Sequence, residues 1–159
     1  MKKINKRNLI TGIVIILCVH IIFAPLIIDK ARWYELQNQT MDLLGEALIN
    51  QDIELMDELF DPDCEFVKID YTESTYSSER ENIGEIWDTS DFEITNYYYV
   101  SIHPSQNIIF NYANFLFSVM IKDANGNRYK QSAFLQIHRN DRFSCSITSI
   151  NWYLSDNPK

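Results

Sequence analysis

The order of apolar and polar positions divides the chain into an apolar segment, two helical segments and a series of strands. Residues 9–28 contain no charged side chain, and at about 1.5 Å of rise per residue they form a helix of roughly 30 Å, the thickness of a bilayer core. From Trp33 to Leu48 the apolar residues recur at helical spacing. This pattern predicts an amphipathic helix over residues 31–50.

A second, short helix and a first strand follow the amphipathic helix. Asp52 is a natural N-cap, and Pro62 cannot continue a helix, so the second helix is expected between these two residues. Residues 64–71 then alternate as a strand does. Ser78, followed three residues later by Glu81, forms a capping box that predicts a third short helix.

The C-terminal part of the chain predicts four strands joined by short turns, which force antiparallel neighbours. Asn125-Gly126 indicates a type I′ hairpin turn, which needs positive φ at both residues. In the last strand the apolar parity slips after Ile147, so a bulge is expected near Thr148. The predicted strands cover residues 92–103, 107–122, 128–139 and 143–154.

Period-two alternation assigns the strand residues to two faces of this sheet. The apolar face is expected to lie against the helices, and its hydrogen-bonding residues form a candidate small-molecule pocket: Tyr98, Tyr112, Asn114, Tyr129 and Gln131. The opposite face is expected to carry exposed aromatic and histidine side chains, which are typical of protein interfaces unless a loop or the C-terminal tail covers them. This candidate interface comprises Tyr97, Tyr99, His103, Phe134 and His138.

The net charge of −8 is unevenly distributed along the chain. Residues 1–29 carry +3, and the remainder therefore carries −11. Between Asp52 and Glu93 fifteen carboxylates face only Lys68 and Arg80. Such a surface repels phosphate backbones, which excludes nucleic acid as a partner. An acidic run of this kind forms either a solvated face or a surface for a partner.

The flanks of the apolar segment predict its orientation in a membrane. Four basic residues precede it and Asp29 follows it, which places the N-terminus in the cytoplasm. A cleaved signal peptide is the rival interpretation, but its apolar region is shorter and ends in small residues, whereas here Pro25 follows Ala24. We therefore expect a basic tail over residues 1–8, a transmembrane signal anchor over 9–28 and an extracytoplasmic domain over 33–155, in the cell membrane.

The sequence contains few residues at the spacings typical of disulfides, metal sites or catalytic motifs. Cys18 lies in the apolar segment, so Cys64 and Cys145 either pair or remain thiols. No metal-ligand spacing, nucleophile elbow or phosphate-binding loop occurs. We predict no catalytic residue, no metal site and no cofactor, and an enzyme is not the favoured interpretation.

The segment over residues 43–67, LLGEALINQDIELMDELFDPDCEFV, resembles the entry of the nuclear transport factor 2-like, or cystatin-like, superfamily. The resemblance covers residues 33–155 and implies an α+β fold in which helices pack on a curved antiparallel sheet. Enzymes of this superfamily, such as ketosteroid isomerase and the polyketide cyclases, are implied to keep Asp, His or Tyr inside this cone. Here the acids that could enter it are Asp52, Asp70 and Asp91, and for Asp52 the helix cap is the better interpretation.

A single membrane span followed by this fold also resembles the scaffold subunits of bacterial type IV secretion and conjugation machines. The sequence therefore predicts a membrane-anchored interaction or assembly module without catalysis. Its expected partner is a second copy of the chain or another envelope protein. The alternative is a cone that binds a small molecule, as a cyclase or isomerase does.

Overall fold

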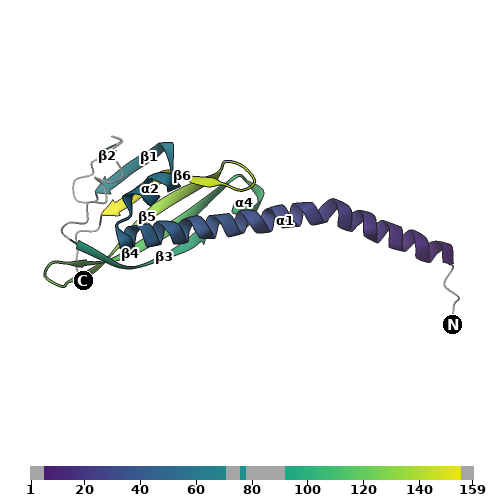
Figure 1. Cartoon of the computed structure of the whole chain (residues 1–159), viewed down its shortest axis with the longest axis horizontal. Helices are drawn as coiled ribbons and strands as arrows, with labels where there is room; N and C mark the ends of the chain where they lie inside the picture. The colour runs from purple at the N-terminus through teal and green to yellow at the C-terminus, as the bar shows by residue number, and fades with distance from the viewer. Residues whose placement is uncertain (1–5, 71–75, 78–91, 155–159) are drawn as a thin grey trace.

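One long helix and a curved sheet make up most of the molecule (Figure 1). The structure is a computed structural model that describes residues 6–70, 76–77 and 92–154. Its elements, in chain order, are α1 (Lys6–Asn50), α2 (Ile53–Leu59), β1 (Phe60–Asp70), β2 (Tyr76–Ser77), β3 (Phe92–Ile102), α4 (Pro104–Ile109), β4 (Tyr112–Asp123), β5 (Arg128–Arg139) and β6 (Cys145–Leu154). The third predicted helix, with Ser78 and Glu81, lies outside the described residues.

The apolar segment and the amphipathic helix form one continuous element, α1. No Gly or Pro lies between residues 28 and 33, so nothing interrupts the helical hydrogen bonds there. The large apolar side chains from Ile10 to Ile28 are exposed, whereas Trp33, Met41 and Leu44 are at most 1% exposed. Within the described residues α1 is the one helix long and apolar enough to cross a membrane.

The break between α1 and α2 follows the local chemistry. Gln51 adopts a positive φ of 57° and reverses the chain direction. The backbone N–H of Leu55 donates to Asp52 Oδ1 at 3.1 Å, so the predicted N-cap role of Asp52 is confirmed. Helix α2 ends at Leu59, before Pro62, and β1 begins at Phe60, four residues earlier than predicted.

The six strands form one sheet in the order β2-β1-β6-β5-β4-β3. Strands β3 to β6 make the predicted antiparallel meander, while β1 runs parallel to β6. The α+β fold class with helices on a curved sheet is confirmed, and the sheet is mixed rather than wholly antiparallel. Pairing of distant strands is not encoded in local pattern, which is why the parallel pair was not predicted.

Two of the predicted turns differ from the structure. Pro104 occupies the first position of α4, where its fixed φ favours a helix, so a helical turn replaces the short loop and β4 begins only at Tyr112. In the β4–β5 hairpin only Gly126 has positive φ, and its N–H donates to the carbonyl of Asp123 at 2.9 Å. The turn is therefore centred on Ala124 and Asn125, and the type I′ prediction was wrong.

Two bulges decide which side chains face α1. The predicted bulge near Thr148 is confirmed, because Gln136 pairs with Ser149 while Ile137 pairs with Ile147. A second bulge, which was not predicted, lies between Ile94 and Asn96 of β3. It reverses the parity of the rest of that strand.

The predicted faces of five candidate residues, three on β3 and two on β4, are wrong. Tyr97 and Tyr99 face α1, and Tyr98, on the same strand, faces outward. Tyr112 and Asn114 also point outward, because their neighbours Ala113 and Phe115 are buried against the helix. In β4 both faces carry apolar residues, so alternation alone did not distinguish them.

The core lies between α1 and the helix-facing side of the sheet. The largest buried sheet residues, each at most 1% exposed, are Phe115, Phe117, Leu135, Ile137, Ile147 and Ile150. Cys64 and Cys145 also lie at this layer and remain thiols. Cys145 Sγ is 3.0 Å from Thr40 Oγ1, and burial raises the pKa of the Cys145 thiol.

Gly45 allows α1 to approach β3 closely. The ring of Tyr97 lies directly against Gly45 and is stacked on Phe117, with ring centroids 5.9 Å apart. A Cβ at position 45 would overlap the Tyr97 ring. The helix therefore needs glycine here, although glycine costs about 1 kcal/mol relative to alanine inside a helix.

We predict that Gly45→Ala lowers the free energy of unfolding by about 1–3 kcal/mol, because overpacking outweighs the gain in helix propensity. In a Tyr97→Ala background the ring is absent, and the same substitution should raise stability by up to about 1 kcal/mol. Urea unfolding of the full chain in detergent, followed by near-ultraviolet circular dichroism, measures both effects. An effect of the same sign in both backgrounds would contradict this packing argument.

Candidate functional site

The five residues of the predicted pocket do not come together in the structure. Lys130 Nζ lies 4.7 Å from the Tyr98 ring centroid on the outer face of the sheet. Asn114, also on that face, accepts a hydrogen bond from Gln136 Nε2 at 3.2 Å. Tyr112 stacks on Phe110, with centroids 5.3 Å apart.

The other two predicted pocket residues lie on the helix-facing side. Tyr129 donates from its hydroxyl to Asp123 in the β4–β5 turn, and Gln131 is half-buried opposite Val119. The Asp123 carboxylate also accepts from two groups of Asn127 and from the N–H of Asn125. The hydrogen bond from Tyr129 first, and then these donors, lower the pKa of Asp123. This carboxylate organises a turn.

The predicted interface residues are also divided between the two faces. Tyr99 donates from its hydroxyl to Asp42 Oδ1 of α1 at 2.9 Å, and burial together with this carboxylate raises the pKa of Tyr99 to about 12. Phe134 and His138 lie on the outer face, where Phe134 is half-buried and His138 is exposed. His103 is exposed and precedes α4 with a positive φ of 56°.

An apolar row crosses the outer face of the sheet. Val100 of β3 pairs with Leu116 of β4, which pairs with Phe134 of β5. Val100 is 58% exposed and Leu116 is 36% exposed. We call these three residues the outer row. A large apolar row of this kind on an open sheet is typical of an interaction surface.

Polar pairs border the outer row on both sides. Ser118 and Ser132 are hydrogen-bonded at 2.8 Å on one side, and Asn114 and Gln136 on the other. Among the described residues of β3, β4 and β5, Glu93 is the one carboxylate on this face, and it pairs with Lys122 at 3.6 Å. In the described residues of β3 to β5 the outer face thus carries little negative charge, although the protein is strongly acidic.

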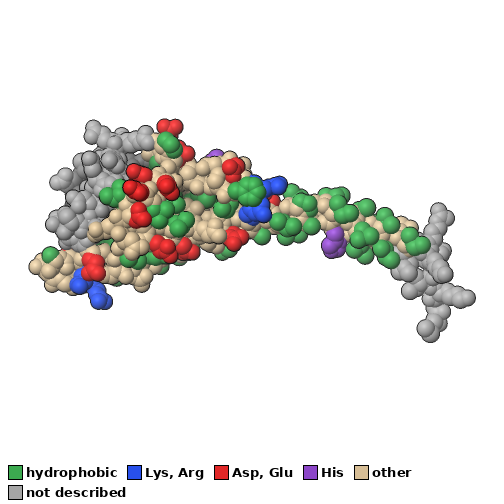
Figure 2. Space-filling model, viewed as in Figure 1, with side chains coloured by type: hydrophobic (Ala, Val, Ile, Leu, Met, Phe, Trp, Pro, Cys, Tyr) green, Lys and Arg blue, Asp and Glu red, His purple; other side chains and the backbone are tan. Residues whose placement is uncertain are grey.

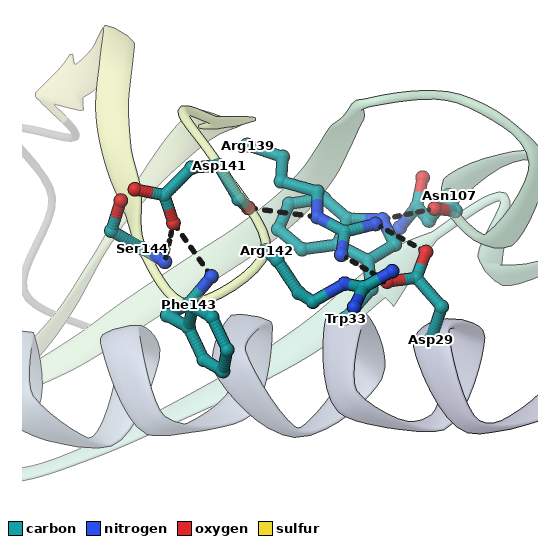
Figure 3. A network of polar contacts seen from close by, with 8 residues as sticks. All are labelled: Asp29, Trp33, Asn107, Arg139, Asp141, Arg142, Phe143 and Ser144. Atoms are coloured by element: carbon teal, nitrogen blue, oxygen red, sulfur yellow. Dashed lines mark hydrogen bonds and ion pairs between the residues drawn. The ribbon is translucent and has the colours of Figure 1, made fainter. Parts of the chain in front are cut away.

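A second candidate site lies where the apolar part of α1 meets the domain (Figure 3). We call it the junction and define it by Asp29, Trp33, Arg139 and Arg142. Arg139, the last residue of β5, donates from both terminal nitrogens to the two oxygens of Asp29, at 2.9 and 2.7 Å. Arg142 Nε lies 3.5 Å from the same carboxylate. The hydrogen bond from Arg139 lowers the pKa of Asp29, so this carboxylate is ionised at neutral pH.

Trp33 completes this junction from the next turn of α1. Its indole Nε1 donates to the backbone carbonyl of Asn107 at 2.6 Å, and the Arg139 guanidinium lies 5.8 Å from its ring centroid. The ring is 1% exposed. The indole therefore holds both α4 and the end of β5 against the same turn of α1.

The β5–β6 loop owes its shape to Asp141. The backbone N–H groups of Phe143 and Ser144 donate to Asp141 Oδ1 at 2.6 and 2.8 Å, and these bonds lower the pKa of Asp141. An open pocket of about 260 Å³ lies between this loop and α1, lined by Asp29, Asn111, Arg139, Asn140, Asp141 and Arg142. Across the described residues no group of three or more metal-ligating side chains occurs.

Neither the outer row nor the junction was predicted from the sequence. Val100 was assigned to the wrong face because the bulge in β3 was not predicted, and Leu116 because both faces of β4 carry apolar residues. Arg139 and Asn107 were not singled out, because their partners on α1 lie 110 and 74 residues away along the chain. One signal was present: Asp29 is the first charged residue after the apolar segment, and a carboxylate at that depth needs a cationic partner.

No family model and no curated protein matches this sequence. Solved structures do match. A nuclear transport factor 2-like protein from Cytophaga hutchinsonii aligns at a TM-score of 0.54 with 12% identity, over 77% of this chain and 98% of that protein. One of unknown function from Shewanella baltica aligns at 0.55 with 12% identity, over 78% and 94% of the two chains.

An uncharacterized protein with a cystatin-like fold from Caulobacter vibrioides aligns at a TM-score of 0.52 with 12% identity, over 79% of this chain and 90% of that one. At such low identity the likeness establishes the architecture and leaves function to the site itself. The chain therefore has the nuclear transport factor 2-like, or cystatin-like, fold.

Proposed function

We propose that this protein is a single-pass membrane protein, without catalytic activity, whose extracytoplasmic domain associates with a second copy through the outer row. The continuity of α1 carries this proposal. The same helix presents an apolar surface over one half and supplies the core of the domain with the other half.

The charges at the two ends of the apolar segment support the orientation. Lys2, Lys3, Lys6 and Arg7 precede it, and the acidic remainder follows it, so the basic tail is cytoplasmic and the domain extracytoplasmic. The exposed apolar side chains from Ile10 to Ile28 cover a length that matches a bilayer core. In water such a surface is unfavourable.

The junction supports a fixed orientation of the domain on this anchor. Two hydrogen bonds from Arg139 and the bond from Trp33 tie the sheet and α4 to α1 within two helical turns of Ile28. The sheet lies alongside α1 (Figure 1), so its outer face points sideways relative to the helix axis. On a helix that crosses the membrane, this face looks along the membrane plane.

A second copy is the partner that this geometry favours. Copies anchored in one membrane meet side by side, and confinement raises their effective concentration. Their acidic surfaces repel one another, but the outer face carries one paired carboxylate among the described residues of β3 to β5. The outer row can therefore be buried between two copies at little electrostatic cost.

Leu116→Asp should dissociate this dimer. An unpaired charge buried at an interface costs about 2 kcal/mol or more, which weakens association at least about 30-fold. Light scattering on the detergent-solubilised full chain measures the mass. The matched control is Ile53→Asp on α2, also at an exposed apolar residue, which should leave the dimer intact. A monomeric wild-type chain, or equal effects of both substitutions, would refute the proposed interface.

Anchoring predicts that the full chain stays in the membrane pellet after alkaline extraction. Replacing both Ile15 and Ile21 with Lys should release a large fraction, because each charge at mid-membrane costs about 2.5–3.5 kcal/mol. Ile49→Lys, near the far end of α1, serves as the control and should not release the chain. Release of the unsubstituted chain at alkaline pH would rule out the anchor.

The Asp29–Arg139 pair predicts a pH dependence. Because the native pKa of Asp29 is lowered, the pair stabilises the folded state above about pH 4 and loses this contribution as the pH falls through the native pKa. Asp29→Asn should therefore lower the melting temperature at pH 6, and the difference from wild type should shrink by pH 3. Thermal unfolding in detergent at both pH values tests this, with Asp57→Asn on α2 as the control. A difference that does not depend on pH would show that the pair is not responsible.

A further inference from the structure

The end of the domain next to the apolar part of α1 carries exposed apolar side chains. Ile109, the last residue of α4, is 69% exposed, and Phe110 after it is 45% exposed. Ile108 is also exposed. These side chains lie outside the core. The buried residue through which α4 is attached to the domain is Asn107, whose carbonyl accepts from Trp33.

The junction fixes the height of α4 along α1. The carbonyl of Asn107 accepts from Trp33, and Asn111 lines the same pocket as Asp29. Asp29 directly follows Ile28, and Trp33 lies about 6 Å beyond Asp29 along the helix. The headgroup layer on each side of a bilayer is about 5–8 Å thick. The exposed apolar residues of α4 are therefore level with the headgroups when residues 9–28 span the core.

Cationic side chains lie at the same level. Lys30 is exposed, Arg142 has a side chain that is 66% exposed, and the Arg32 guanidinium lies 4.8 Å from the ring centroid of Phe143. Together with Arg139 they make four cations, against the carboxylates of Asp29, Asp141 and Glu35. Figure 2 shows blue side chains where the green part of α1 enters the domain.

Asp42 and Glu46 of α1 lie beyond this level. Asp42 is thirteen residues after Asp29, which is about 20 Å along α1, whereas the Debye length at physiological salt is about 8 Å. Of the acids that follow Asp29 on α1, only Glu35 lies within about 10 Å of it. Asp61 of β1 accepts a hydrogen bond from Ser146 of β6 at 3.4 Å. Headgroups at this level therefore meet the cations, while solvent ions screen Asp42 and Glu46.

From this arrangement we infer that the end of the domain next to the apolar part of α1 lies in the headgroup layer of a membrane that contains anionic lipids. We call this end the basal surface and define it by Lys30, Arg32, Ile108, Ile109, Phe110 and Arg142. Its apolar residues enter the boundary between headgroups and acyl chains, and its cations contact lipid phosphates. The inference rests on the proposed anchoring of α1, which sets the height of the membrane.

Depth-dependent quenching tests this inference on the full chain in vesicles of phosphatidylcholine with about one quarter phosphatidylglycerol. Ile109→Cys carries a nitrobenzoxadiazole dye, and lipids with a spin label near the headgroup act as quenchers. The matched control is Ile53→Cys on α2, which is 50% exposed at the other end of the domain. The unsubstituted chain measures background labelling of the native cysteines.

We expect blue-shifted emission and strong quenching at position 109, and solvent-like emission without quenching at position 53. The labelled Ile109→Cys chain with its native cations should show weaker quenching in vesicles of phosphatidylcholine alone. In vesicles that contain phosphatidylglycerol, the same labelled chain with Lys30→Gln, Arg32→Gln and Arg142→Gln should also show weaker quenching. Equal quenching with and without phosphatidylglycerol would overturn the anionic-lipid contact. This lipid comparison needs no variant at the cations, so it stands even where the triple variant fails to fold.

Flotation of the same samples separates failure of this inference from failure of the anchor. A chain that does not float with the vesicles refutes the anchoring itself. A chain that floats but has equal, solvent-like emission at positions 109 and 53 refutes the basal surface alone. A blue shift at position 109 that depends on protein density and is not quenched by the labelled lipid would assign the surface to a second copy and would also refute it.

Discussion

The packing of one face of α1 against the sheet is the interaction on which the rest of the structure depends. Trp33, Met41, Leu44 and Leu48 bury their side chains against strands that have no other described helix of comparable length. Helix stability in proteins comes mainly from such burial. Because α1 carries no charged residue between Leu9 and Ile28, its register against the sheet sets where the apolar surface ends and the domain begins.

The transition between these two halves takes place within one helical turn. Asp29 and Arg32 interrupt the apolar surface, and Trp33 begins the buried face. A lone carboxylate at the edge of an apolar segment is costly, and the fork from Arg139 offsets that cost. The same contact brings the end of β5 to the helix, so one ion pair both satisfies Asp29 and positions the sheet.

Most elements could be predicted from the sequence, since helical spacing and alternation are local properties of the chain. The N-cap at Asp52, the strand over 128–139 and the bulge at Thr148 all follow from neighbouring residues. The faces of β3 could not be predicted in this way. One extra residue at Thr95 reverses every later side chain, and nothing in the alternation of Tyr97, Tyr98 and Tyr99 marks it.

The candidate sites were harder to predict than the fold, because they join residues that are far apart in the sequence. Asp29 meets Arg139 across 110 residues of chain, and α4 contacts Trp33 where Pro104 starts a helix in place of the simple turn that was expected. Local pattern identifies such residues as ordinary polar positions. Their roles follow from the three-dimensional pairing, which determines which of them meet.

Because α1 continues without a break through the junction, the domain tilts together with the apolar segment. Asn50 lies 22 residues beyond Ile28, which is about 33 Å along the helix. If α1 spans the membrane as proposed, a change in tilt of about 10°, within the range that bilayer thickness imposes on spanning helices, displaces that far end sideways by about 6 Å. The spacing between neighbouring domains would then vary with the thickness of the membrane that holds them.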